Sequence, residues 1–205
     1  GYTFATNAGH SESDWVGEVV ASAGDFDGDG RADVAVVARF EDLPASFDVA
    51  QWVVDPACSG TRNNPGAVLV YSGVASGALS GQPSFVYFAP QADRTIQMVA
   101  GDLDVNGDGL DDLIVGGANW LSTDAAAERR GGYAVVLGRA REAGGLSAVS
   151  CTSDAFLEGS VINDELGYSA TGLGDLDGDG CDEVAIGARL LDRTGSSDEG
   201  GVHIL

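Results

Sequence analysis

Three short segments carry oxygen-bearing side chains at alternate positions and could therefore bind a metal ion. Loop 1 spans residues 25–33, loop 2 spans 104–112 and loop 3 spans 175–183, and each places glycine at its fourth and sixth positions. Calcium prefers oxygen ligands, and glycine at the sixth position permits the sharp turn that gathers them. The expected ligands are the side chains at positions 1, 3, 5 and 9 and the carbonyl at position 7, namely Asp25, Asp27, Asp29, Arg31 and Asp33; Asp104, Asn106, Asp108, Leu110 and Asp112; and Asp175, Asp177, Asp179, Cys181 and Glu183.

The residues after each loop separate it from the helical calcium motifs. An EF-hand needs a bidentate glutamate at position 12, but this sequence has Val36, Val115 and Ile186 there. Apolar, β-branched segments follow directly, so each loop is predicted to join two antiparallel strands. The alternative is a metal-free turn that uses aspartate and glycine for their turn preferences. Such a turn does not need four oxygens in this register, and we expect three calcium sites.

Composition removes several classes of function. The chain has 32 acidic and 10 basic residues and a net charge of -22, so nucleic acid and anionic membranes are poor partners. It has no lysine, which excludes a P-loop lysine and a Schiff base. Its 2 histidines do not form an HExxH motif, and no GxSxG is present. We therefore expect no enzyme activity, and the short apolar stretches predict no membrane insertion.

The acidic segment belongs to a longer repeat. The first and third copies align without a gap at an offset of 150 residues, and short apolar segments recur at 66–73, 132–138 and 201–205. Weaker apolar segments at 84–89 and 155–159 supply a fourth strand. Four strands per unit are typical of a β-propeller blade. We expect one all-β domain over residues 1–205, with blades at about 9–89, 93–159 and 160–205, the last incomplete.

These repeats resemble FG-GAP repeats, the blades of the propeller at the head of integrin α chains and of many bacterial secreted proteins. The third copy is most similar, with Leu166 and Gly167 in the FG place and residues 186–188, Ile-Gly-Ala, in the GAP place. No copy has the GAP proline. The resemblance implies an open segment of a seven-bladed ring, with the acidic loops on the lower face and ligands bound on the upper face.

Carried over to this chain, the upper loops are roughly residues 40–65, 120–131 and 190–200. Only the first is long and rich in aromatic residues, and binding loops on rigid scaffolds often have this character. Its candidate ligand-binding residues are Phe40, Phe47, Trp52 and Arg62. The alternative is that the aromatic side chains pack the loop onto the propeller. The blade geometry also places Cys151 and Cys181 near the lower face of adjacent blades, so we expect a disulfide between them.

Together these features predict a secreted or cell-surface module, in which structural calcium stabilises a propeller used for adhesion or for recognition of a protein or glycan ligand. Three copies do not close a ring, so further blades or another chain are expected to complete it. Two alternatives remain at this point. The propeller could belong to a secreted carbohydrate-active enzyme, such as a lyase or glycosidase, or it could serve only as a spacer.

Overall fold

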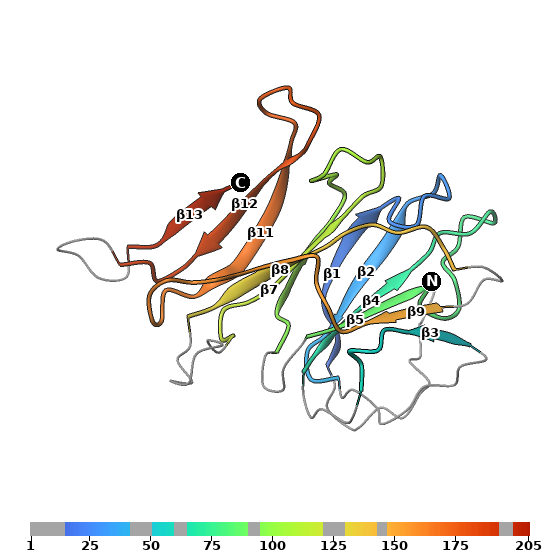
Figure 1. Ribbon diagram of the computed structural model, residues 1–205, viewed down its shortest axis with the longest axis horizontal. Coiled ribbons are helices and arrows are strands. Elements are labelled where there is room, and N and C mark those ends of the chain that lie inside the picture. Colours follow the sequence, from blue (N-terminus) through green and yellow to red (C-terminus); the bar gives the residue numbers. More distant parts are fainter. Residues whose placement is uncertain are drawn as a thin grey trace.

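The computed structural model describes residues 15–41, 51–59, 65–89, 95–120, 130–142, 147–192 and 199–205. All regular structure within these ranges is β, which confirms the predicted fold class. Three sheets, built mainly from antiparallel strand pairs, lie side by side along the long axis of the molecule and form an open array of propeller-type blades (Figure 1). None of the described segments forms a helix that could span a membrane.

Each sheet begins with a pair of strands joined by an acidic loop. Blade 1 contains, in spatial order, β1 (Val16–Gly24), β2 (Asp33–Ala38), β4 (Ala67–Tyr71), β5 (Phe85–Phe88), β9 (Ser147–Ser150) and β3 (Trp52–Val54). Blade 2 contains β10 (Ala155–Glu158), β8 (Gly132–Val136), β7 (Leu113–Gly117) and β6 (Met98–Ala100). Blade 3 contains β11 (Leu166–Gly174), β12 (Glu183–Ala188) and β13 (Gly201–Ile204).

The predicted hairpins are present in all three blades. β1 pairs antiparallel with β2, β6 with β7, and β11 with β12, so loops 1, 2 and 3 each connect two neighbouring strands. The apolar segments predicted after the loops form β4, β8 and β13. The weaker fourth strands form β5 in blade 1 and β10 in blade 2.

Apolar side chains that alternate along the strands hold the blades together. Ala35 and Val37 on β2 and Val68 and Val70 on β4 are fully buried against apolar residues of blade 2. A second cluster joins the opposite face of blade 2 to blade 3 through residues such as Ile186. Full burial of one Val, Leu or Ile side chain contributes about 1.5–3 kcal/mol. These two clusters therefore fix the order and orientation of the three acidic loops.

The outer face of blade 3 is uncovered. Val202 and Ile204 on β13 pair with Gly187 and Ala185, the same register in which β4 pairs with β2 in blade 1. Val202 and Ile204 are 66% and 63% exposed, whereas their counterparts Val68 and Val70 are 0% exposed. The face that blade 1 packs against its neighbour is thus exposed to solvent in blade 3.

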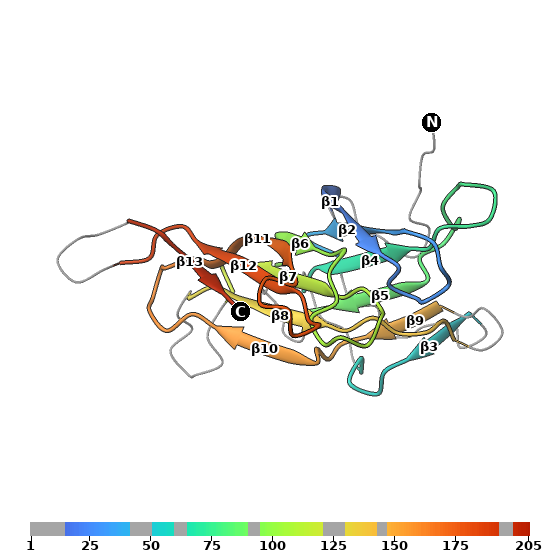
Figure 2. The same ribbon diagram turned by 90° about the horizontal axis from the view of Figure 1, so that it is seen from above.

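Two short strands were not predicted from the sequence. β9 pairs in parallel with β5 and also with β3, which extends blade 1 beyond its fourth strand (Figure 2). Residues 147–150 lie within the range expected for blade 2, yet they are part of the sheet of blade 1. Unlike β5 and β10, these two strands lie outside the repeated pattern, and their pairing depends on contact between segments distant in the sequence.

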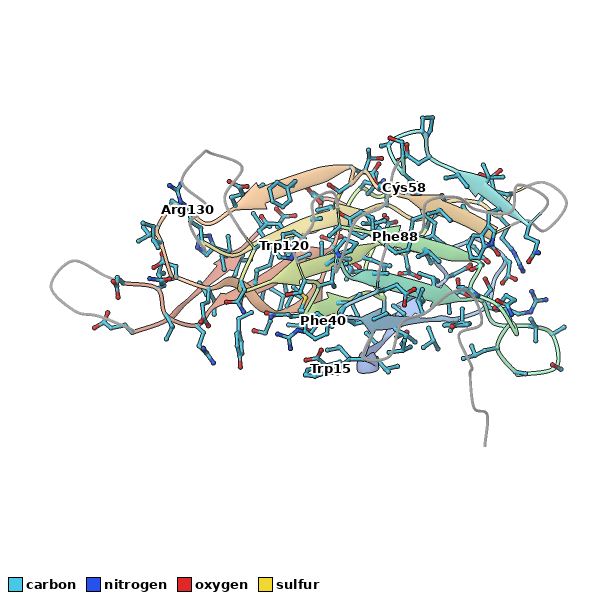
Figure 3. All side chains as sticks on the ribbon, turned by 90° about the horizontal axis from the view of Figure 1, so that it is seen from below. Trp15, Phe40, Cys58, Phe88, Trp120 and Arg130 are labelled. Carbon is cyan, nitrogen blue, oxygen red and sulfur yellow. A yellow bond between two sulfur atoms is a disulfide. The ribbon has the colours of Figure 1, made fainter. Side chains whose placement is uncertain are left out.

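The predicted disulfide between Cys151 and Cys181 is wrong. Cys151 instead bonds to Cys58, which is labelled in Figure 3, with a Cα–Cα distance of 5.2 Å. Cys181 is free. The reason is the parallel pairing of β3 with β9, because each cysteine follows one of these two strands and the pairing brings them to the same end of the sheet. Cys181 lies in loop 3, on another blade.

The disulfide closes a separation of 93 residues, so its loss is expected to destabilise the fold. Cross-links of this kind typically contribute about 2–5 kcal/mol. We expect Cys58→Ser and Cys151→Ser each to lower the urea midpoint, whereas Cys181→Ser leaves it close to that of the parent. Alkylation of the denatured, unreduced parent should modify Cys181 alone. Labelling of Cys58 instead would contradict the assignment.

Candidate functional site

The three acidic loops share one backbone conformation. The glycines at positions 4 and 6 have positive φ values: 72° and 83° in loop 1, 70° and 87° in loop 2, and 82° and 96° in loop 3. Glycine adopts this left-handed region without the steric cost that other residues meet. The repeated Gly-Asp-Gly pattern therefore lets each loop fold back so that its side chains converge.

A hydrogen bond from position 6 to position 1 closes each loop. The Gly30 amide donates to Asp25 Oδ2 at 2.9 Å. In loop 2 the Gly109 amide donates to Asp104 Oδ2 at 2.8 Å, and in loop 3 the Gly180 amide donates to the Asp175 carboxylate at 3.1 Å. This bond fixes one oxygen of the first aspartate. In loop 1 the other oxygen of this aspartate, Asp25 Oδ1, is buried and has no hydrogen-bond partner, whereas Oδ1 of Asp104 and of Asp175 accepts the amide of the aspartate at position 5.

Loop 1 buries carboxylate oxygens that the protein does not satisfy. Oδ1 of Asp25, Asp27 and Asp29 and Oδ2 of Asp33 are buried and have no hydrogen-bond partner. Oxygens of Asp25, Asp27 and Asp29 also lie within 4.8 Å of one another. An unsatisfied buried polar group costs about 1–3 kcal/mol, and more when it is charged. A divalent cation bound among the oxygens of Asp25, Asp27 and Asp29 would satisfy those three, so these residues fit a calcium ion, while Asp33 is not part of the group within 4.8 Å.

Loop 3 gathers its acids in a similar way. Oxygens of Asp175, Asp177 and Glu183 lie within 4.8 Å of one another, although these side chains are more exposed than those of loop 1. Glu183 Oε2 accepts a hydrogen bond from the Leu176 amide at 2.6 Å. In loop 2, Asp112 Oδ2 accepts the corresponding bond from the Val105 amide at 2.9 Å. The longer glutamate at position 9 therefore reaches the same place in its loop as the aspartate.

Loop 2 differs because asparagine stands at its third position. Asn106 Nδ2 donates to Asp108 Oδ2 at 2.9 Å, and the Asp108 amide donates to Asn106 Oδ1 at 2.9 Å. The amide oxygen remains a suitable calcium ligand, and the site carries one negative charge fewer than loops 1 and 3. Of the predicted ligands, the structure brings together three acids in loop 1 and three in loop 3, while, among the described residues, Asp33, Asp179 and the acids of loop 2 are not part of such a group.

The acid at position 9 also ties the loop to the third strand of its blade. The Gly73 amide, just after β4, donates to Asp33 Oδ1 at 2.9 Å. The Gly138 amide, just after β8, donates to Asp112 Oδ1 at 2.7 Å. A cation bound at position 9 would therefore stabilise a contact between the hairpin and the next strand, in addition to the turn itself.

Burial changes the titration of these two acids. The pKa of Asp33 rises from 3.8 to about 6, mainly through burial, with the negative charges of Asp27 and Asp29 contributing to the rise and the Gly73 hydrogen bond opposing it. Burial likewise raises the pKa of Asp112 to about 6, with Asp104 and Asp108 adding to the effect. Without a cation, the folded protein therefore holds protons at both positions more tightly than the unfolded chain does.

This shift predicts opposite pH dependences with and without calcium. The folded pKa exceeds the unfolded value, so for these groups the metal-free fold is most stable below about pH 4 and loses stability as pH rises through about 6. Calcium needs the ionised forms, so its stabilising effect should grow between about pH 5 and pH 7. Calorimetric melts in EDTA and in calcium across this range test both trends.

The variant carrying Asp33→Asn and Asp112→Asn is the matched control, because asparagine keeps the side-chain shape and does not titrate. In EDTA its melting temperature should vary less between about pH 5 and pH 7 than that of the parent. An unchanged pH profile would show that other acids cause the dependence.

The aromatic candidates of the first upper loop lie in two different environments. Phe40 is half-buried, with its ring edge-to-face with Trp15 at 5.0 Å and 5.2 Å from the Arg39 guanidinium carbon; Figure 3 shows both rings on the same edge of the molecule. Trp52, on β3, packs against the apolar cluster that includes Leu69. Phe47 and Arg62 lie outside the described residues.

The structure adds contacts that sequence reasoning missed. Ser72 Oγ donates to Asp27 Oδ2 at 2.6 Å, and Arg141 Nε lies 3.5 Å from the same oxygen. Asp111 and Asp182, at position 8 of loops 2 and 3, accept hydrogen bonds from the preceding loop. Of these residues, only the position-8 acids could have been singled out in the sequence, because each directly precedes the acid at position 9. The others depend on how the blades pack.

Comparison with known families agrees with this geometry. The family described as FG-GAP repeat matches the chain over residues 16–71 and 167–205. The first matched segment contains loop 1 with β1, β2 and β4, and the second contains loop 3 with β12 and β13. The match therefore covers two of the three acidic hairpins described above.

Proposed function

This chain is an FG-GAP repeat protein of the propeller type, and from that premise we propose that it is a calcium-binding recognition module of a secreted or cell-surface protein. The observation that carries the proposal is the set of four buried carboxylate oxygens without partners in loop 1. Acidic oxygens in that number and register are suited to a hard divalent cation.

Calcium in this proposal is structural. One loop supplies the side chains at positions 1, 3, 5 and 9 and a carbonyl at position 7, so the ligand set comes from a single hairpin. The bonds from Gly73 to Asp33 and from Gly138 to Asp112 extend the effect to the next strand of the blade. The ion would stabilise the blades and leave recognition to other surfaces, so we propose a binding module and not an enzyme.

Two observations support an extracellular location. The Cys58–Cys151 disulfide is of the kind that forms and persists in oxidising compartments. Extracellular calcium is also abundant enough to fill sites of modest affinity, with dissociation constants of about 10⁻⁴ to 10⁻³ M. A module of this type would act in adhesion, with a protein or glycan ligand on the upper face.

The exposed face of blade 3 supports the proposal that another part of the propeller packs against it. Val202 and Ile204 expose the apolar positions that blade 1 buries against blade 2. Contiguous exposed apolar surface usually marks a site of contact with another protein. We propose that further blades or another chain cover this face and complete the propeller.

Calcium binding gives the direct test of the proposed function. We expect about three ions per chain, one per loop, and a higher melting temperature with calcium than with EDTA. A site filled at 100 times its dissociation constant stabilises the fold by about 2.7 kcal/mol. Asp29→Ala and Asp179→Ala should each remove about one ion, measured by isothermal titration calorimetry and metal analysis.

Glu18→Gln is the matched control, because it removes an acid that pairs with Arg39 away from the loops. Its calcium content should equal that of the parent. A parent chain that binds no calcium and melts at the same temperature in EDTA would contradict the proposed function.

A further inference from the structure

Neighbouring acidic loops are bonded to each other through the aspartate at position 8. Between blades 1 and 2, the Asp25 amide donates to Asp111 Oδ2 at 2.6 Å, and the Asp111 amide donates to the Asp25 carbonyl at 3.3 Å. Asp25 is the first expected ligand of loop 1. Both of its main-chain polar groups are therefore held by a residue of loop 2.

The second pair of blades repeats this arrangement. The Asp104 amide donates to Asp182 Oδ2 at 3.0 Å, and the Asp182 amide donates to the Asp104 carbonyl at 2.8 Å. Asp104 is the first expected ligand of loop 2. The same reciprocal pair of bonds thus links position 1 of one loop to position 8 of the next at both interfaces.

The position-8 residue is adjacent in sequence to the ligand at position 9. Asp111 precedes Asp112, and Asp182 precedes Glu183. The first expected ligand of one loop is therefore connected to the last expected ligand of the next through a reciprocal pair of hydrogen bonds and one peptide unit. The path runs from loop 1 to loop 2 and from loop 2 to loop 3.

A second contact between the loops lies beside this link. A Cβ at Gly28 would lie 2.7 Å from Leu110 Cδ2, and a Cβ at Gly107 would lie 2.9 Å from the Gly180 carbonyl oxygen. Neighbouring loops are therefore in van der Waals contact at these glycines. At Gly178 in loop 3, a Cβ would meet nothing within 4 Å.

We propose that Asp111 and Asp182 are positioning residues that couple calcium binding in neighbouring loops, so that an ion in one loop raises the affinity of the next. The inference rests on the calcium binding proposed above. Binding orders the residues of the occupied loop, and the linked residues of the next loop then lose less conformational entropy when their own ion binds. The coupling is reciprocal by thermodynamic necessity.

Loop 1 marks the end of this coupling. Its position 8 is Ala32, which has no side-chain oxygen to accept the corresponding bond from another loop. The Asp111 carboxyl also packs on Gly24, the last residue of β1, where a side chain would overlap it, whereas nothing lies within 4 Å of a Cβ at Gly174, the last residue of β11. The three loops are therefore joined by two links, and in each link position 1 of the earlier loop is bonded to position 8 of the later loop.

The test follows each loop separately in the full chain. Amide NMR signals of Gly30, Gly109 and Gly180 report on loops 1, 2 and 3 during a calcium titration, because each of these amides donates to the first ligand of its own loop. Asp29→Ala empties loop 1. It is combined with Asp111→Ala in a double-mutant cycle, and the midpoint of the Gly109 signal is compared among the parent, both single variants and the double variant.

We expect Asp29→Ala to raise the calcium midpoint of loop 2 by about fivefold or more when Asp111 is present, within the usual range of coupling between sites. In the Asp111→Ala background the same change should leave that midpoint nearly unaltered. Asp111→Asn keeps an oxygen that can accept the Asp25 amide and loses the charge, so it should retain the coupling. This variant separates the hydrogen bond from simple electrostatic attraction of calcium.

Each outcome has a distinct meaning. If all three glycine signals titrate with calcium but the Gly109 midpoint is the same in the parent and in Asp29→Ala, the coupling is overturned and the proposed function stands. Equal effects of Asp29→Ala with and without Asp111 would overturn the role of this residue. If no glycine signal responds to calcium, both the proposed function and the coupling are wrong. Should Asp111→Ala fail to fold, loss of coupling in Asp111→Asn overturns the hydrogen-bond link.

Discussion

Repulsion among the acids of each hairpin loop is the constraint on which the structure depends. Two ionised carboxylates with oxygens within 4.8 Å of each other repel by at least about 3 kcal/mol at an effective dielectric constant of about 20. Loop 1 holds several such pairs in a partly buried place, where hydrogen bonds leave four oxygens unsatisfied. The positive φ of Gly28 and Gly30 and the Gly30–Asp25 bond hold these acids together despite this cost. A bound cation converts the repulsion into attraction.

The packing of the blades determines what a cation in one loop can affect. Apolar contacts between blades bring position 1 of each loop against position 8 of the next, and the bonds of Asp111 and Asp182 follow from that contact. The position-9 acids join the same loops to the ends of β4 and β8. The repulsion among carboxylates within one turn is thereby linked to the stability of all three blades. A calcium ion bound as proposed would therefore stabilise the contact with the next strand as well as the turn.

The repeated loops could be predicted because the expected ligands and the turn glycines of each loop lie within nine consecutive residues. The hairpins and strands β4, β5, β8, β10 and β13 follow from the same period. The remaining features depend on contacts between blades. β9 joins blade 1 only because blade 2 lies beside it, and the Cys58–Cys151 bond follows from that pairing. The sequence does not distinguish Asp111 from the other acids, because its role depends on the hydrogen bond that it accepts from the Asp25 amide of another blade.

The central claim is that the unsatisfied oxygens of loop 1 coordinate calcium. A crystal structure of the calcium-loaded chain tests it most directly. The account predicts an ion with anomalous signal about 2.3–2.6 Å from Oδ1 of Asp25, Asp27 and Asp29 and from Oδ2 of Asp33. A loop that stays free of metal in calcium, with those oxygens turned to water or to other donors, would contradict it.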